Sequence, residues 1–252
     1  MLAGEAAARG VLAKPSHLEL LVPPGRSVAA RLTLSGTTAE RTRVRIHVED
    51  FDLDIEGRPI RGAATASRPT SAGAFLVDPE ELVLEGGEAQ TVFVDVQAPE
   101  GSLPSRWALL VLDVEEEENG GAAPLAATRL LVPVVANVDG SPAPDLKILS
   151  FETARSGASG CVAHLVVENG GDVAVRPRLA LGLAPASRRE SDELALTERG
   201  SFLLLPGHRR ILQGPVDCGA ATSNVEVVGT IELDTTRLLG TAALPAAVRG
   251  AP

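Results

Sequence analysis

Hydrophobic and polar residues alternate along most of this chain, and turn residues interrupt the alternation at short intervals. In Arg43–Phe51, for example, Val44, Ile46 and Val48 alternate with charged residues. A period of two gives a strand one buried face and one wet face, and no stretch sustains the period of an amphipathic helix. The strands predicted in the first half are Leu18–Val22, Val28–Leu34, Arg43–Phe51, Gly73–Val77, Leu82–Leu84, Ala89–Gln97, Arg106–Val114 and Thr128–Asn137.

The breaks between these strands consist of residues that favour chain reversal. They lie at Pro23–Gly25, Glu56–Pro59, Glu85–Gly87 and Pro99–Gly101. Proline presets one backbone angle of a turn, and glycine supplies positive φ without steric cost. Short alternating strands that are separated by such turns are typical of a β-sandwich.

A cluster of Pro, Gly and Ser at Gly140–Pro144 predicts a linker near the middle of the chain. It separates an N-terminal domain, residues 14–139, from a C-terminal domain, residues 145–248. Ser187–Arg199, rich in Arg and Glu, is expected to be a solvated hairpin loop or one short helix. The strands predicted in the second half are Leu146–Thr153, Gly160–Glu168, Val175–Leu183, Ser201–Leu205, Arg209–Gln213, Asn224–Leu233 and Gly240–Leu244. The predicted fold class is therefore all-β, with two β-sandwich domains in tandem.

Composition supports this architecture and narrows the classes of partner. Hydrophobic residues make up 44% of the chain but aromatic residues only 2%, so branched aliphatic side chains must fill the cores. The net charge of −10 argues against nucleic acid and anionic lipid as partners, since both require a basic surface. No apolar run is long enough for an integral membrane segment. Met1–Leu12 lacks the apolar core of a signal peptide, so either a signal has been removed or the protein is cytosolic.

Two cysteines, Cys161 and Cys218, are the only ones in the chain. Their wide separation excludes the short spacing of zinc-binding or thioredoxin-type cysteine pairs. They form either a disulfide, which requires an oxidising compartment, or two buried thiols.

Neither acidic residues nor histidines form a recognisable chemical site. The acidic residues between Asp50 and Glu56 alternate with apolar ones and lack the spacing of a calcium loop, so a wet strand face that leads into a turn is expected. Histidines are scattered and form no metal-binding pair; they are His17, His47, His164 and His208. No phosphate-binding or nucleophile motif is present. The sequence therefore predicts no catalytic residue, no metal and no cofactor.

The single tryptophan, Trp107, opens an alternating strand. We expect it to fill the first core, with Phe75 and Phe93 as neighbours.

Several segments of the first half resemble one known family. They are Leu18–Leu34 with its Pro-Pro-Gly corner, VEDFDLDIEGRP (Val48–Pro59), FLVDPEELVLEGGEAQTVFVDVQAP (Phe75–Pro99) and LPSRWALLVLDV (Leu103–Val114). These segments are similar to the N-terminal domain of the periplasmic pilus chaperones, the PapD-like family, and Val166–Leu181 resembles a segment of that family's second domain. The resemblance implies two immunoglobulin-like domains, a periplasmic or other extracytoplasmic location and no catalytic centre.

The resemblance also implies a way of binding. Such chaperones lend a strand to an incomplete pilus subunit, which is a form of β-strand addition. The matching strand is Thr128–Val138, where Arg129, Leu130, Val132, Val134 and Ala136 are the candidate subunit-binding residues. An ordinary buried strand is the alternative. Pro133 carries no N–H and favours a position near an edge of the sheet.

Family chaperones hold the terminal carboxylate of the subunit with a pair of cations. The candidates for this role here are Lys14 and Arg129. The acidic run Glu115–Glu118 lies where the family carries a subunit-contacting loop, although a solvated loop is the simpler interpretation. A disulfide between Cys161 and Cys218 would suit an extracytoplasmic location.

The function predicted from the resemblance is that of a periplasmic assembly chaperone. Its partner would be a secreted pilus or surface protein subunit, and an outer-membrane usher is a further candidate. The alternative is a structural or surface-attached protein of the cell envelope, or of a filament, that uses PapD-like sandwiches to bind protein or wall polymer.

Overall fold

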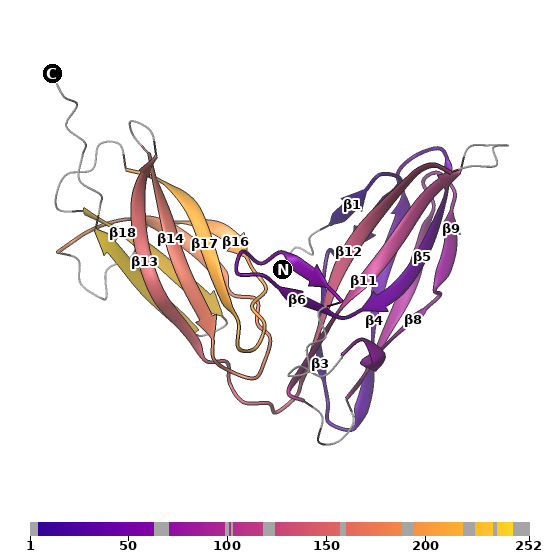
Figure 1. The fold of residues 1–252 in the computed structure, drawn as a ribbon, viewed down its shortest axis with the longest axis horizontal. Coiled ribbons are helices and arrows are strands. Elements are labelled where there is room, and N and C mark those ends of the chain that lie inside the picture. Colours follow the sequence, from indigo (N-terminus) through magenta and orange to yellow (C-terminus); the bar gives the residue numbers. More distant parts are fainter. Residues whose placement is uncertain are drawn as a thin grey trace. The chain divides into compact units, whose positions relative to one another are not determined.

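A computed structural model describes residues 5–62, 71–98, 101, 103–117, 124–156, 160–187, 194–218, 225–233 and 236–243, and their regular structure is almost entirely β-strand (Figure 1). Contacts between residues divide the chain into two units. The first is Met1–Asp52 with Pro59–Ser141, and the second is Leu53–Arg58 with Pro142–Pro252. Each unit has its own pair of larger sheets and its own hydrophobic core.

In the first unit, ten strands form two five-stranded sheets that face each other. The first sheet has the order β1-β2-β4-β10-β8, with β1 (Ala6–Ala8), β2 (Val11–Lys14), β4 (Arg26–Gly36), β10 (Ala89–Ala98) and β8 (Phe75–Asp78). The second has the order β3-β12-β11-β5-β9, with β3 (Leu18–Val22), β12 (Pro124–Val138), β11 (Ser105–Glu117), β5 (Arg41–Glu49) and β9 (Glu81–Leu84). A hairpin of β6 (Phe51–Leu53) and β7 (Pro59–Arg61) follows β5, and a short 3₁₀ helix, η1 (Ala72–Ala74), precedes β8.

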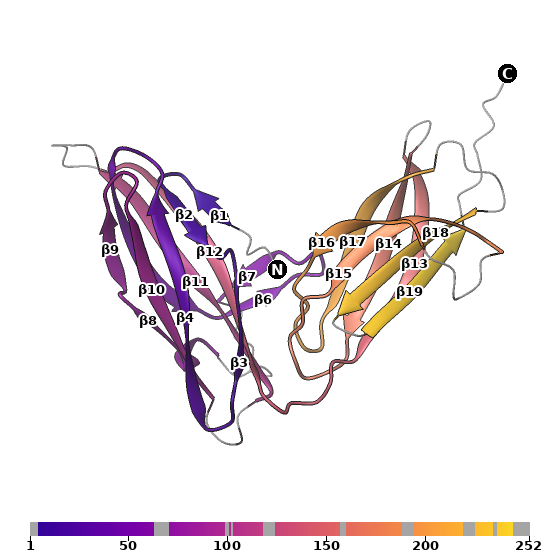
Figure 2. The ribbon, with the colours of Figure 1, turned by 180° about the vertical axis from the view of Figure 1, so that it is seen from behind.

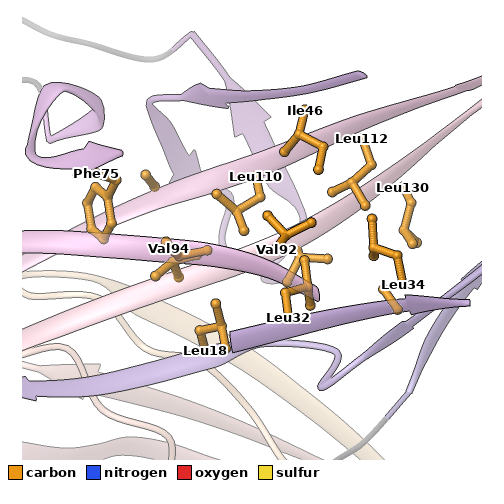
Figure 3. Close-up of a cluster of buried hydrophobic side chains, with 14 of the residues drawn as sticks. Leu18, Leu32, Leu34, Ile46, Phe75, Val92, Val94, Leu110, Leu112 and Leu130 are labelled. Atoms are coloured by element: carbon orange, nitrogen blue, oxygen red, sulfur yellow. The ribbon is translucent and has the colours of Figure 1, made fainter. Parts of the chain in front are cut away.

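The core of the first unit lies between these two sheets. Figure 3 shows Leu32 and Leu34 of β4, Val92 and Val94 of β10, and Leu110 and Leu112 of β11 converging there. These residues follow the predicted period of two, because successive side chains of a strand point to opposite faces of its sheet. Aliphatic side chains dominate the cluster, as the low aromatic content requires.

The second unit repeats this plan with fewer strands. One sheet has the order β13-β14-β17, with β13 (Leu146–Ser156), β14 (Gly160–Asn169) and β17 (Arg209–Asp217). The other has the order β16-β15-β18-β19, with β16 (Leu196–Ser201), β15 (Arg178–Pro185), β18 (Val225–Leu233) and β19 (Thr236–Ala243) (Figure 2). Both units divide their strands between two sheets as immunoglobulin-like sandwiches do. The predicted fold class, all-β with two such domains in tandem, is confirmed.

Strands β1 and β2 are among those that were not expected from the sequence. Both begin ahead of residue 14, where the first domain was predicted to begin, and they extend the first sheet of the first unit. Their residues are mostly alanine, which has no strong preference for strands, so pairing with β4 must decide their conformation.

Placing Trp107 in the first core was wrong. Ala108 and Leu110 of β11 point into the core, so Trp107 points to the other face of the sheet, where its indole N–H donates to Phe51 O at 3.1 Å. Of the two predicted neighbours, Phe75 is in the core, whereas Phe93 is 40% exposed. The guanidinium of Arg31 lies 5.8 Å from the centre of the Phe93 ring.

The prediction for Ser201–Leu205 was also wrong. The strand in this region, β16, ends at Ser201, and the following residues Phe202–Leu205 are buried without belonging to a strand. One isolated bridge joins Leu204 to Val175. A buried apolar run need not be a strand, since burial alone does not distinguish a strand from a packed loop. Of Ser187–Arg199, which was expected to be a loop or a short helix, residues 188–193 lie outside the described part and the end belongs to β16.

Candidate functional site

Strand β12 has a neighbour on both sides over only part of its length. It runs antiparallel to β11 from Pro124 to Asn137. On its other side, β3 runs parallel to it and pairs only with Val134–Val138. The side of Ala127–Pro133 that faces away from β11 therefore has no strand partner among the residues that the structure describes. We refer to this side of Ala127–Pro133 as the open edge of β12.

The predicted subunit-binding residues of β12 separate into two faces. Leu130, Val132, Val134 and Ala136 are buried in the core of the first unit, and Figure 3 shows Leu130 directed toward that core. On the outer face, the side chain of Arg129 is 46% exposed and Leu131 is partly exposed. The core-facing set fills this chain's own sandwich, so what β12 can offer a partner is its open edge and its outer face.

Pro133 indicates which backbone groups point to the open edge. It pairs with Leu109 in a ladder whose only irregularity lies between Glu116 and Glu117. Because proline is tolerated in a sheet where its missing N–H would face away from the neighbouring strand, the nitrogen of Pro133 faces away from β11. Backbone groups of every second residue share one side of a strand, so the N–H groups of Leu131 and Arg129 face the open edge as well.

Both candidate cations already form ion pairs. Arg129 donates its Nε–H to Asp113 Oδ1 at 2.6 Å, across the β11–β12 ladder. Lys14, at the end of β2, donates to Glu5 Oε1 at 3.0 Å. The two cations lie on opposite sheets of the first unit. A role for them in binding a carboxylate stays a prediction.

Arg129 belongs to a wider set of charged side chains on the outer face of the second sheet. Arg43 of β5 lies 2.7 Å from Glu81 of β9, and Arg45 of β5 lies 3.4 Å from Glu115 of β11. Opposite charges on adjacent strands favour this register of the sheet. They also make the outer face polar along β5 and at Arg129 of β12.

Next to these charges, Glu49 holds the β6–β7 hairpin. Arg61 of β7 donates its Nε–H to Glu49 Oε2 at 2.7 Å, and a second bond joins Arg61 Nη2 to Glu49 Oε1. His47 Nε2 lies 2.9 Å from Glu49 Oε1. The hydrogen bond from Arg61 is the largest influence and, against a smaller opposing effect of burial, lowers the pKa of Glu49 from 4.5 to about 2.

The acidic residues around Asp50 make local backbone contacts. Asp50 Oδ1 accepts hydrogen bonds from the N–H groups of Ser71 and Ala72, at 2.7 and 2.9 Å. Asp54 Oδ1 accepts from the N–H groups of Glu56 and Arg58, at 2.9 and 2.8 Å. These carboxylates stabilise turns, as is common for aspartate.

Glu116 was expected to be solvated, and this prediction was wrong. The run Glu115–Glu117 continues β11, and the side chain of Glu116 is only 3% exposed. Its Oε2 lies 3.0 Å from Arg9 Nε, which belongs to the turn between β1 and β2. Its Oε1 is buried without a hydrogen-bond partner among the residues that the structure describes. Only the period of two along β11 could have indicated this inward orientation, because Glu116 continues the series Leu110, Leu112 and Val114.

In the second unit, Cys161 and Cys218 form a disulfide bond. Cys161 lies at the start of β14, and Cys218 directly follows β17, the strand that pairs with β14. The disulfide therefore joins the ends of two neighbouring strands.

In the described part of the chain, no group of three or more His, Cys, Asp or Glu side chains is placed to hold a metal ion. Within the same residues, no helix is long and apolar enough to cross a membrane.

Comparison with known proteins finds similarity in structure but not in sequence. No family model and no curated protein matches the sequence. One similar solved structure is a chain from the chaperone–tip adhesin complex of CFA/I fimbriae biogenesis, at a TM-score of 0.48 and 13% identity, covering 94% of this chain and 100% of the other. A second is from the CsuC–CsuE chaperone–subunit complex of Acinetobacter baumannii Csu pili, at a TM-score of 0.44 and 12% identity, covering 80% and 89%. A third is the periplasmic chaperone SfaE, at a TM-score of 0.42 and 12% identity, covering 93% and 100%.

The resemblance to the PapD-like pilus chaperones, predicted from the sequence, is thus confirmed as a similarity to solved structures of fimbrial chaperones. The fold stated above rests on this chain's own strand order and cores.

Proposed function

We propose that this chain binds an extended segment of a secreted pilus or surface subunit by β-strand addition at the open edge of β12. The periplasm, or another extracytoplasmic compartment, is the proposed location. In this role the protein acts as an assembly chaperone, and it performs no catalysis.

The open edge of β12 is the observation that carries this proposal. Unpaired N–H and C=O groups along an edge strand are a template for another strand. A partner segment that pairs there would extend the second sheet beside β12, with β3 beyond its end. Main-chain hydrogen bonds would supply the affinity, and side chains on the two faces of the added strand would supply selectivity.

The outer face of β12 indicates which partner side chains would fit. Leu131 and Pro133 offer apolar surface, and Arg129 offers a cation whose Nε is engaged by Asp113. A partner strand that is mainly apolar and carries an acidic residue opposite Arg129 would match this face, because opposite charges on paired strands stabilise the pairing.

The proposal is tested by removing one N–H from the open edge. The full chain is titrated with a fluorescein-labelled peptide of about ten residues in which valine and threonine alternate, and binding is followed by fluorescence anisotropy. Leu131→Pro removes an N–H that faces the open edge, and we expect it to weaken peptide binding about ten-fold or more.

Leu131→Ala is the matched control, since it also loses the leucine side chain but keeps the N–H. We expect Leu131→Ala to bind the peptide nearly as well as the native chain. Equal weakening by both variants would show that the side chain, and not the backbone edge, binds the peptide. No weakening by Leu131→Pro would place the binding elsewhere.

A further inference from the structure

The open edge of β12 has a neighbour in the chain's own N-terminal segment. Strand β1 pairs with β2 in the first sheet, and it also lies beside β12 without forming a ladder with it. Figures 1 and 2, which view the molecule from opposite sides, both show β1 next to β12. Arg9, which follows β1, contacts Glu116, and Glu116 is paired with Ala126 of β12. This contact places the end of β1 near the start of the open edge.

An ion pair, a close approach and a backbone hydrogen bond from Thr37 N–H to Gly10 O, at 3.0 Å, hold the turn after β1. The side chain of Arg9 is largely exposed, whereas that of Glu116 is buried. Gly10 has a φ of 83°, and a Cβ at this position would come within 2.9 Å of Glu116 Oε1. The turn therefore fits closely over the buried carboxylate. Because Glu116 Oε1 has no hydrogen-bond partner among the described residues and Oε2 pairs with Arg9, loss of Arg9 would remove the ion pair of a buried carboxylate.

The remaining contacts of β1 are weak. It has one hydrogen-bonded neighbour, β2, with three paired positions from Ala6↔Ala13 to Ala8↔Val11. Ala6 and Ala8 pack against the core, but alanine side chains bury little apolar area. At its other end, Glu5 pairs with Lys14, and both side chains are about half exposed, so this pair contributes little.

We propose that β1 is a displaceable cover of the open edge of β12, held in place mainly by the Arg9–Glu116 ion pair. With β1 in place, a strand that approaches the open edge competes with the Ala6–Ala8 segment for the same side of the sandwich. When β1 separates from β2, the edge becomes accessible. This inference rests on the proposed function, because it concerns access to the same edge.

Amide hydrogen exchange on the full chain tests the cover directly. Arg9→Ala is expected to speed exchange at least about ten-fold in Ala6–Ala8 and in the open-edge amides of Arg129 and Leu131. Lys14→Ala is the matched control: it removes one cation from the same hairpin but breaks only the exposed pair with Glu5. We expect Lys14→Ala to exchange like the native chain. Unchanged exchange at Arg129 and Leu131 when Ala6–Ala8 is released would overturn the proposal.

A second variant locks β1 instead of releasing it. Ala6 and Ala13 are directly paired, so Ala6→Cys combined with Ala13→Cys can form a disulfide across β1 and β2. In its oxidised form, this variant is compared with the native chain, and both keep the Cys161–Cys218 bond. We expect slower exchange at Arg129 and Leu131 and weaker binding of the valine–threonine peptide. If exchange at Arg129 and Leu131 is slowed but the peptide binds as tightly as it does to the native chain, β1 and the peptide do not compete, and the proposal is wrong.

The same measurements separate this inference from the proposed function. Faster exchange at the open edge in Arg9→Ala, together with tighter peptide binding, supports both. Faster exchange without peptide binding to any variant supports β1 as a cover and removes strand addition as the function. Peptide binding that is lost in Leu131→Pro but unaffected by Arg9→Ala and by the locked variant supports strand addition and removes the cover.

Discussion

At the scale of single residues, several polar side chains of the first unit form hydrogen bonds with backbone groups or with charged side chains on neighbouring strands. Trp107 donates a hydrogen bond to Phe51 O, and Asp50 accepts hydrogen bonds from the N–H groups of Ser71 and Ala72. Arg61 donates two hydrogen bonds to the carboxylate of Glu49. These contacts all involve Phe51–Arg61 or its flanking residues. They explain how a short hairpin keeps a defined position beside the larger sheet.

The Glu49–Arg61 pair makes stability depend on pH. Because the pKa of Glu49 falls from 4.5 to about 2 on folding, the pair stabilises the folded chain fully above pH 4.5 and loses this effect as the pH falls through about 2. We expect Arg61→Ala to lower the free energy of unfolding of the first unit at pH 7 and to leave it almost unchanged below pH 2, because the pair is partly exposed and is lost once Glu49 is protonated. Denaturant unfolding at several pH values measures the difference.

Arg31→Ala is the control for this prediction. It removes an arginine that lies over the Phe93 ring, so its effect should not change over the same pH range. A pH-independent effect of Arg61→Ala would show that the hairpin is held by something other than the carboxylate of Glu49.

At the scale of elements, strand β12 shows how a short neighbour creates a binding edge. Strand β3 covers only Val134–Val138, because the chain passes from the first sheet to the second between Lys14 and Leu18. The residues before this crossing form β1 and β2, which belong to the first sheet and not to the sheet of β12. The open edge is thus a consequence of where the N-terminal segment changes sheets.

The disulfide of the second unit is also an element-scale feature, since it ties β14 to the end of β17. It closes a loop with a sequence separation of 57, for which the chain-entropy estimate is roughly 4 kcal/mol. We expect Cys161→Ala with Cys218→Ala to lower the free energy of unfolding of the second unit by several kcal/mol. Differential scanning calorimetry of the full chain checks this.

The first unit is the internal control, because neither cysteine belongs to it. A matching loss of stability in the first unit would contradict the prediction. The bond also bears on the proposed location, since disulfides form and persist in oxidising compartments.

At the scale of the whole molecule, each unit has its own core. The first core gathers residues from both of its sheets, among them Leu34, and the second gathers residues such as Leu165, which is fully buried. Separate cores allow each unit to fold as a domain of its own.

We therefore expect core substitutions to act on one unit at a time. Leu34→Ala should lower the stability of the first unit by about 2–5 kcal/mol, and Leu165→Ala should do the same to the second, through lost burial and the cavity that remains. Calorimetry of each variant should show one shifted transition and one unshifted transition. Leu34→Met and Leu165→Met, which nearly conserve volume, should cost less than about 1.5 kcal/mol. A shift of both transitions by one substitution would argue for a single cooperative unit.

Much of the fold could be predicted from the period of two and the turn residues. Leu18–Val22 was predicted with its observed bounds as β3, and Ala89–Gln97 is one residue shorter than β10. The strands that were missed, such as β1 and β16, have few β-branched or aromatic residues, so no local pattern marked them. The candidate site was predicted only as a strand, because alternation identifies a strand but not the edge that it leaves open.

The amino-acid sequence by itself determined that this chain forms short strands with one apolar face each, because the side-chain period of a strand is a local property of its backbone. Only the tertiary structure decided that Leu130 and Val132 serve the chain's own core, that Arg129 and Lys14 already have acidic partners, and that β3 stops short of Pro133. These features depend on which strands become neighbours. Pairing between distant segments is selected by the packing of the whole sandwich, and no single stretch of sequence specifies it.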